Sequence, residues 1–107
     1  MVSAKRFDVW LVNFNSTQGK EINKTRPCVV ISPNEMSALS TVLMAPMTTK
    51  RFGFPSRVVC KFKSKKGLIF LDQIRAVDKS RLVKKIGTIS DKTKVEIGTN
   101  SQEMFAF

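Results

Sequence analysis

The sequence predicts a small, mainly β domain, a curled sheet or barrel that ends in one helix. Short runs rich in β-branched and aromatic residues recur along the chain, and Pro, Gly and Asn separate them at short intervals. The length of 107 residues suits one domain with a modest core, and the hydrophobic share of 42% is typical of a globular protein. No repeat or low-complexity segment interrupts the pattern. One domain over residues 1–107 is therefore expected.

The first two strands are separated by a polar loop. Residues 7–14 are rich in strand formers and alternate in their first half, which predicts a strand. Residues 15–24 are polar and contain a glycine, which is typical of a loop. The second strand opens at Arg26 and runs to about Ser32. Because Pro27 lacks a backbone donor, we expect it at the first position of a strand or on an edge.

A third strand and a second polar loop follow. Residues 35–39 allow one helical turn, and residues 41–45 read as a strand that Pro46 ends. Residues 47–55 hold two hydroxyls, two cations and two aromatic rings in succession. This loop is the second place, after Arg26, where groups suited to an anionic ligand collect.

The remaining strands are short and lead to a terminal helix. Residues 56–62 alternate as a fourth strand, residues 63–67 form a solvated turn, and residues 67–73 give a fifth strand that residues 74–78 continue after a bend. A further short strand is expected over residues 85–89.

The terminal helix is expected to begin at Ser90 and Asp91, which are good N-cap residues. Its apolar marks are Val95, Met104 and Phe105. Gly98 weakens the helix, because glycine has a low helix propensity.

The charge of the chain points to a polyanionic partner. Nineteen Lys and Arg against eight Asp and Glu give a net charge of +11 and a pI near 10.2. Nucleic acid and an acidic protein tail both fit this charge. A membrane fits less well, because no run of about 18 apolar residues exists. The N-terminus lacks an apolar signal-peptide region, which predicts a cytoplasmic protein.

Metal and disulfide chemistry are not expected. Cys28 and Cys60 both lie in apolar runs, where reduced buried thiols are the common case. With no His in the chain, the usual zinc sites cannot be assembled. We therefore expect neither a metal nor another cofactor.

Short motifs follow one another along nearly the whole chain. They are Asp8-Val9-Trp10-Leu11-Val12, Gly19-Lys20-Glu21, Thr25-Arg26-Pro27-Cys28-Val29-Val30-Ile31-Ser32-Pro33, Ala45-Pro46-Met47-Thr48-Thr49 and Leu71-Asp72-Gln73-Ile74-Arg75-Ala76-Val77-Asp78. In this order they resemble the MazF/PemK/Kid toxins, the ribonuclease partners of bacterial toxin–antitoxin operons. The resemblance implies an SH3-like barrel with a C-terminal helix that works as a homodimer. It also implies metal-independent cleavage of single-stranded RNA, usually mRNA, and an antitoxin whose acidic tail covers the RNA groove and with which the toxin binds DNA.

Metal-free cleavage uses the neighbouring 2′-hydroxyl of RNA as nucleophile, so the protein must supply a base, an acid and donors for the phosphorane charge. Arg26 suits the donor role because its guanidinium matches phosphate geometry, and the family motif gives its arginine a catalytic role. The alternative is an ion pair with Glu21 or Asp72. Thr48 matches the catalytic threonine of the family, or else it caps the turn after Pro46.

Asp72 is the third catalytic candidate. It is the only carboxylate inside an expected apolar strand, which favours a role as general base, and some family branches are proposed to use the equivalent aspartate as the base. The alternative is a structural partner for Arg26 or Arg75. The branch resembling Kid carries an arginine and a histidine where this chain has Phe70 and Lys20. Arg26 and Thr48 are therefore the main catalytic candidates.

RNA binding is expected along the second polar loop, where cations alternate with aromatic rings that can stack on bases. Phe52 and Phe54 have an alternative place in the core or at a dimer contact. The expected RNA-binding residues are Lys20, Glu21, Thr49, Lys50, Arg51, Phe52, Phe54, Arg57, Gln73 and Arg75.

Two other functions remain open from the sequence. A gyrase poison resembling CcdB would share the fold, but that family depends on a terminal Trp-Gly-Ile, and this chain ends in Met104-Phe105-Ala106-Phe107. A non-catalytic nucleic-acid-binding barrel would explain the charge equally well. An antitoxin or regulator is disfavoured, because the charge has the wrong sign and no helix-turn-helix pattern is seen.

Overall fold

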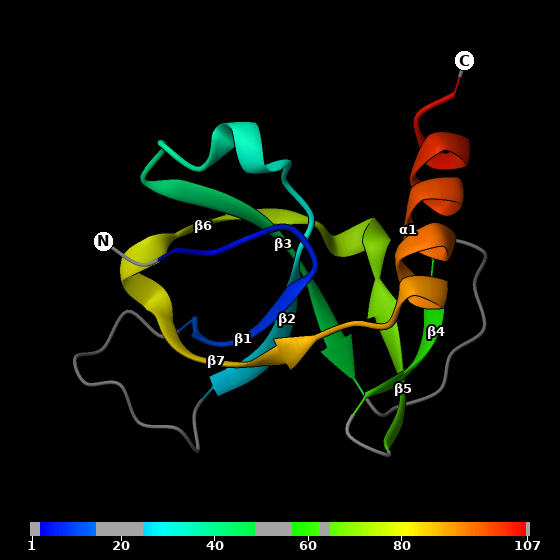
Figure 1. Cartoon of the computed structure of the whole chain (residues 1–107), viewed down its shortest axis with the longest axis horizontal. Helices are drawn as coiled ribbons and strands as arrows, with labels where there is room; N and C mark the ends of the chain where they lie inside the picture. The colour runs from blue at the N-terminus through cyan, green and yellow to red at the C-terminus, as the bar shows by residue number, and fades with distance from the viewer. Residues whose placement is uncertain (1–2, 15–24, 49–56, 63–64, 107) are drawn as a thin grey trace.

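The computed structural model in Figure 1 describes residues 3–14, 25–48, 57–62 and 65–106. Over these residues the chain forms seven strands and one C-terminal helix, which confirms the expected fold class. The strands are β1 (Asp8–Asn13), β2 (Thr25–Val30), β3 (Thr41–Thr48), β4 (Arg57–Phe62), β5 (Lys65–Phe70), β6 (Arg75–Asp78) and β7 (Leu82–Thr88). The helix α1 spans Asp91–Met104, and three short 3₁₀ turns are η2 (Asn34–Met36), η3 (Leu71–Gln73) and η4 (Lys79–Arg81).

The strands pair antiparallel in the order β4-β5-β3-β2-β1-β7, and β6 pairs with β3. The sheet curls in the manner of a barrel, and α1 stands beside it near β4 and β5 (Figure 1). The strand β3 therefore has β2 along one side, and along the other it has first β6 and then β5.

Alternate residues of the central strands enter two separate hydrophobic cores. In β2, Cys28 and Val30 face one core while Val29 faces the other. Core 1 comprises Ala4, Trp10, Val12, Cys28, Val30, Val42, Met44, Val77 and Leu82. Core 2 comprises Val9, Val29, Ala45, Val58, Cys60, Ile69, Leu71, Ile89 and Ile97. Cys28 and Cys60 are free buried thiols, as expected.

Pro46 does not end the third strand as the sequence predicted, because β3 runs on to Thr48. The carbonyl of Leu43 accepts a hydrogen bond from Ile31 N at 2.8 Å, so odd-numbered residues of β3 turn their backbone polar groups toward β2. Pro46 thus turns its missing donor away from β2, toward the side where the ladder passes from β6 to β5. The lost donor breaks no ladder bond there, so the strand tolerates the proline.

Pro27 lies third in β2, which corrects the expectation that it opens the strand, but one side of the strand is a local edge at this position, as the alternative expected. It is opposite Leu11 of β1, whereas the ladder with β3 begins only at Cys28. The carbonyl of Val30 accepts from Phe7 N, so even-numbered residues of β2 turn toward β1 and Pro27 turns toward β3. Its missing donor faces the side where pairing has not yet begun.

The later strands begin earlier and end earlier than predicted. Part of the expected turn over residues 63–67 is strand, since β5 begins at Lys65 and pairs with β4. The expected strand to Gln73 stops at Phe70, and residues 71–73 form η3. The strand β6 is then a separate element on β3, not a continuation of β5.

The helix begins as predicted, but it buries a different face. The hydroxyl of Ser90 accepts a hydrogen bond from Thr93 N at 3.3 Å, so Ser90 is the N-cap. Thr93 and Ile97 are buried, and the predicted mark Met104 packs partly buried on core 2, whereas the other predicted marks Val95 and Phe105 are 69% and 68% exposed. Residues four apart share a helix face, and the face defined by Thr93 and Ile97 is the one that packs on core 2. Of the described segments, none is a helix with the length and apolar character needed to cross a membrane.

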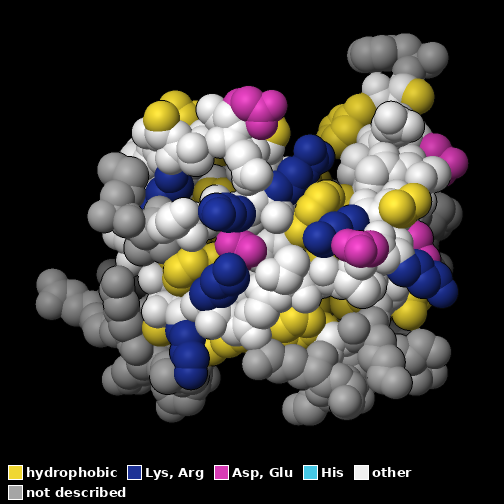
Figure 2. Space-filling model, viewed as in Figure 1, with side chains coloured by type: hydrophobic (Ala, Val, Ile, Leu, Met, Phe, Trp, Pro, Cys, Tyr) yellow, Lys and Arg dark blue, Asp and Glu magenta, His cyan; other side chains and the backbone are white. Residues whose placement is uncertain are grey.

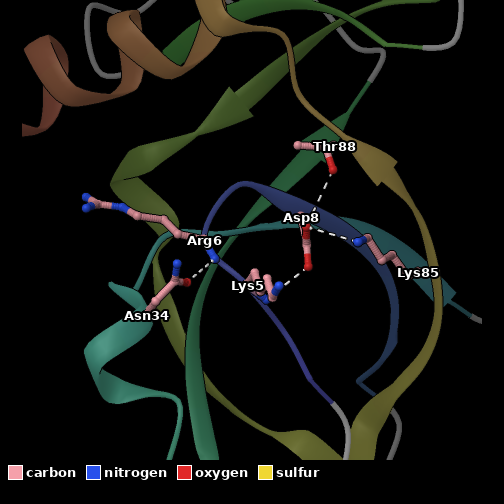
Figure 3. Close-up of polar contacts among 6 residues, drawn as sticks. All are labelled: Lys5, Arg6, Asp8, Asn34, Lys85 and Thr88. Atoms are coloured by element: carbon pink, nitrogen blue, oxygen red, sulfur yellow. Dashed lines mark hydrogen bonds and ion pairs between the residues drawn. The ribbon is translucent and has the colours of Figure 1, made fainter.

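A buried carboxylate ties the start of the chain to β7. Asp8, which is 4% exposed, accepts from Lys5 N at 2.9 Å and from Thr88 Oγ1 at 3.4 Å, and its Oδ1 lies 3.4 Å from Lys85 Nζ (Figure 3). The neighbouring Arg6 N donates to Asn34 Oδ1 at 2.8 Å. The N-terminal segment is thus held to both β7 and η2.

Substituting Asp8→Ala is expected to lower the free energy of unfolding by about 2 kcal/mol, because Lys5 N loses a buried acceptor and Lys85 loses its counter-charge. Urea denaturation of both proteins measures the change. Asp91→Ala is the matched control, since its carboxylate pairs with Lys94 at 3.2 Å but is almost fully exposed. If the two variants shifted the urea midpoint equally, the buried contacts of Asp8 would not be the source of its stabilisation.

Candidate functional site

Four side chains lie toward one end of core 1. On each strand they continue the series of residues that faces this core. Arg26 precedes Cys28 and Val30 on β2, and Phe14 follows Trp10 and Val12 on β1. Thr48 follows Met44 on β3, and Arg75 precedes Val77 on β6. The antiparallel pairing places these four strand ends on the same side of the molecule, and we call Phe14, Arg26, Thr48 and Arg75 the core 1 rim.

Cys28 forms the floor beneath this rim. It is fully buried, and its Sγ donates to the carbonyl of Arg26 at 3.8 Å. Burial raises the pKa of the Cys28 thiol to about 12, although the positive charges of Arg75 and Arg26 pull it down. Both guanidinium groups therefore act on the same buried sulfur from the rim. The thiol stays protonated near neutral pH, so Cys28 is neither a nucleophile nor a base there.

The strands that carry Arg26 and Thr48 separate at the rim. Their last pair is Cys28 with Pro46, and beyond it the start of β2 and the end of β3 diverge (Figure 1). Arg26 is exposed, and Thr48 is half-buried opposite Leu68 of β5. An arginine fork and a hydroxyl thus lie on two strands that open away from each other, in an arrangement suited to an anion placed between them.

Gly67 of β5 lies against the backbone of Thr48. A Cβ added at Gly67 would be 2.8 Å from the carbonyl oxygen of Thr48, which is closer than side chains and backbone normally approach. The glycine therefore permits the contact that fixes the end of β3.

Asp72 lies on η3, which corrects its predicted place inside an apolar strand. Leu71 is buried, whereas Asp72 and Gln73 are both exposed just ahead of Arg75. A turn rather than a strand follows Phe70, so the burial that the apolar run suggested for this carboxylate does not occur. Asp72 is instead presented to solvent next to the rim in sequence.

Several predicted residues lie outside the described part of the chain. They are Lys20, Glu21, Thr49, Lys50, Arg51, Phe52 and Phe54. For Arg57 the structure describes only the backbone, which pairs with Phe70 on β5. The described site therefore rests on the core 1 rim and on η3.

Sequence reasoning missed Phe14. The structure places Arg75 Cζ 4.8 Å from the centroid of the Phe14 ring, and Phe14 packs partly buried against core 1. The signal was present in the alternation of Trp10, Val12 and Phe14, which puts all three side chains on one face of a strand. It was weak because Phe14 precedes a loop, where such alternation normally ends.

Positive charge extends beyond the rim. Lys and Arg side chains are spread over the described part of the face shown in Figure 2, where a notch also separates the helix from the curled sheet. Lys5, Arg6, Lys84 and Lys85 are all exposed. This distribution favours a partner with many negative charges, in line with the net charge of +11.

Comparison with known proteins gives a consistent result. The pattern of the family described as PemK-like, MazF-like toxin of type II toxin-antitoxin system matches residues 5–105. An endoribonuclease MazF of Staphylococcus saprophyticus is 35% identical over 100 residues, covering 87% of this chain and 83% of the relative. An endoribonuclease MazF of Staphylococcus epidermidis is 32% identical over the same shares of both chains.

Solved structures share the fold at lower identity. A MazE-MazF crystal structure from Deinococcus radiodurans has a TM-score of 0.80 and 17% identity, and the match covers 100% of this chain and 99% of that one. A mycobacterial endoribonuclease in complex with its cognate antitoxin has a TM-score of 0.78 and 20% identity, with 92% and 91% covered. Sequence family and fold therefore agree over nearly the whole chain.

Proposed function

Because the chain belongs to the PemK-like, MazF-like toxins of type II toxin-antitoxin systems, we propose that it is an endoribonuclease that cuts single-stranded RNA, with mRNA as its target in the cytoplasm. Its curated relatives are named endoribonucleases, which favours this activity over a gyrase poison resembling CcdB. The observation that carries the proposal is the core 1 rim, to which the strands β2, β3 and β6 contribute Arg26, Thr48 and Arg75. The Arg26 guanidinium and the Thr48 hydroxyl there suit a phosphodiester.

In the proposed reaction the 2′-oxygen attacks the adjacent phosphorus while the bond to the 5′-oxygen breaks. The 2′-hydroxyl gives its proton to a base, and the leaving 5′-oxygen receives one, so the products are a 2′,3′-cyclic phosphate and a 5′-hydroxyl. Arg26 stabilises the negative charge that develops on the phosphorane oxygens. Thr48 donates a hydrogen bond to the same phosphate from the other strand.

Asp72 is the proposed base. It is exposed on η3, two residues after β5 ends and three before Arg75, so a phosphate held at the rim brings RNA toward it. Because the chain contains no His, a carboxylate is the side chain best suited to accept the 2′-proton. Gln73, also exposed, is proposed to contact RNA together with Arg75.

The proposed partners follow from the same charge. An acidic segment of a cognate antitoxin fits a basic rim and would exclude RNA from it. Binding of RNA by such a surface should weaken steeply as salt rises, because bound cations are released from the phosphates. A homodimer is proposed as the working form, as the family resemblance implies.

The decisive experiment incubates the purified protein with mixed-sequence single-stranded RNA in the presence of EDTA and maps both ends of the products. We expect discrete cuts that leave cyclic phosphate and 5′-hydroxyl ends. Cuts that need added divalent metal, or that leave 5′-phosphate ends, would contradict the proposed mechanism. Intact RNA together with a salt-sensitive complex would point to a non-catalytic binding barrel instead.

A further inference from the structure

The contact between Phe14 and Arg75 is not used by the reaction proposed above, although it lies on the same rim. Phe14 follows the last residue of β1, and Arg75 opens β6, so residues far apart in sequence meet here. Arg75 Cζ lies 4.8 Å from the ring centroid of Phe14, within the range of a cation–π contact.

Arg75 is held in place both at its guanidinium group and at its backbone. The Phe14 ring is partly buried against core 1, and the backbone of Arg75 is paired with Met44 of β3. Arg75 is nevertheless exposed, and its charge acts on the buried thiol of Cys28 alongside that of Arg26. An exposed arginine that is immobilised on an aromatic ring loses little further side-chain entropy when it binds a ligand.

We propose that Arg75, held on Phe14, forms a stacking subsite for one unpaired base of the RNA, next to the phosphate bound by Arg26. Proteins that read single-stranded RNA stack splayed bases on aromatic rings or on the planes of arginine guanidinium groups. A phosphate is already provided for by Arg26 and Thr48, whereas a planar cation on an aromatic ring matches the face of a base. This inference rests on the proposed function, because it takes RNA as the ligand.

Within this subsite Arg75 is the contact residue, and Phe14 is a positioning residue that acts through it. A lysine in place of Arg75 would keep the charge and lose the plane. A leucine in place of Phe14 would keep an apolar side chain against core 1 and lose the ring, whereas a tyrosine would keep the ring.

The test measures binding, so that it does not depend on catalysis. The probe is a short oligoribonucleotide with a 2′-deoxy sugar at a mapped cut, or of mixed sequence if no cut is found, in which each base is removed in turn to leave an abasic site. We expect that one abasic position weakens binding to the wild-type protein by about tenfold. Arg75→Lys and Phe14→Leu should weaken binding of the intact probe by a similar factor and should lose their sensitivity to that position.

The controls separate stacking from charge and from folding. Arg6→Gln removes an exposed cation that lies 5.2 Å from the Phe7 ring at the other end of β1, and it should keep the abasic sensitivity. Phe14→Tyr should also keep it, and thermal melting of each variant shows whether it is folded.

Three results would overturn the subsite. Wild-type binding of all probes by Arg75→Lys would assign Arg75 to a phosphate. Full abasic sensitivity in a folded Phe14→Leu protein would remove the role of the ring. Tolerance of every abasic position by the wild-type protein would exclude base stacking altogether. Failure of the proposed function looks different, since RNA would then bind with the expected abasic profile and remain uncut.

Discussion

Replacing Arg26 by alanine is expected to slow RNA cleavage by at least about a hundredfold, which is the usual cost of removing one donor to a developing oxyanion. Its side chain is exposed at the core 1 rim, and β2 is held through backbone pairing and through the buried residues Cys28, Val29 and Val30. The fold should therefore survive the change. Cleavage rates at saturating RNA, together with a thermal melt, test both halves of this prediction.

Lys84→Ala is the matched control for Arg26→Ala. Each substitution removes one exposed positive charge, but Lys84 lies on β7 opposite Leu11, away from the rim. It should weaken RNA binding slightly and leave the rate at saturating RNA unchanged. Equal losses in the two variants would mean that Arg26 contributes only general attraction for RNA. Arg26→Lys should remain slow, because a lysine lacks the fork that matches a phosphate.

Gly67→Ala is expected to lower the rate at saturating RNA by about tenfold or more, although Gly67 has no side chain to take part in the reaction. The added methyl group would lie 2.8 Å from the carbonyl oxygen of Thr48, so the end of β3 must move. A displacement of about 1 Å in a group that contacts the reacting phosphate can cost about a hundredfold in rate. The rate at saturating RNA is the quantity to measure, because the predicted binding residues Lys50 and Arg51 follow Thr48 closely in sequence and the KM for RNA is expected to change as well.

Gly98→Ala distinguishes this effect from a general effect of replacing glycine. Apart from the neighbouring residues and the backbone of α1 itself, no heavy atom of the described residues lies within 4 Å of a Cβ added at Gly98, and alanine favours helix by about 1 kcal/mol over glycine. That variant should be more stable and equally active. If Gly67→Ala, assayed well below its melting temperature, cut RNA at the wild-type rate, the position of Thr48 would not matter for catalysis.

The sequence predicted elements well where a local signal had one reading. The run from Thr25 to Val30 has β-branched residues that suit a strand and little else, and Ser90 caps a helix whose start could be read directly. The prediction from the sequence was wrong at Pro46. Whether a proline ends a strand depends on which neighbouring strand its backbone nitrogen faces. That side is fixed by the partners β2, β5 and β6, which no local pattern reveals.

The candidate site shows the same limit. Arg26, Thr48 and Arg75 were each suspected from residue type and from the family motif, but their shared face follows only from the register of three strands. The apolar residues Leu68, Ile69 and Leu71 predict a strand that includes Asp72. In the structure Leu71 is buried in core 2 and anchors the turn η3 instead. Phe14 became a candidate only when its partner Arg75 was seen beside it.

The pairing of β1 with β7 also determines when this protein can fold during its synthesis. Asp8 and Thr88 are 80 residues apart in sequence and yet share one hydrogen bond, so β1 lacks its second neighbour until β7 has been made. Contacts at such separations form late and slow the folding of β proteins. A nascent chain that stops short of Thr88 therefore has a sheet that is open along β1, and we expect such a chain to cut no RNA.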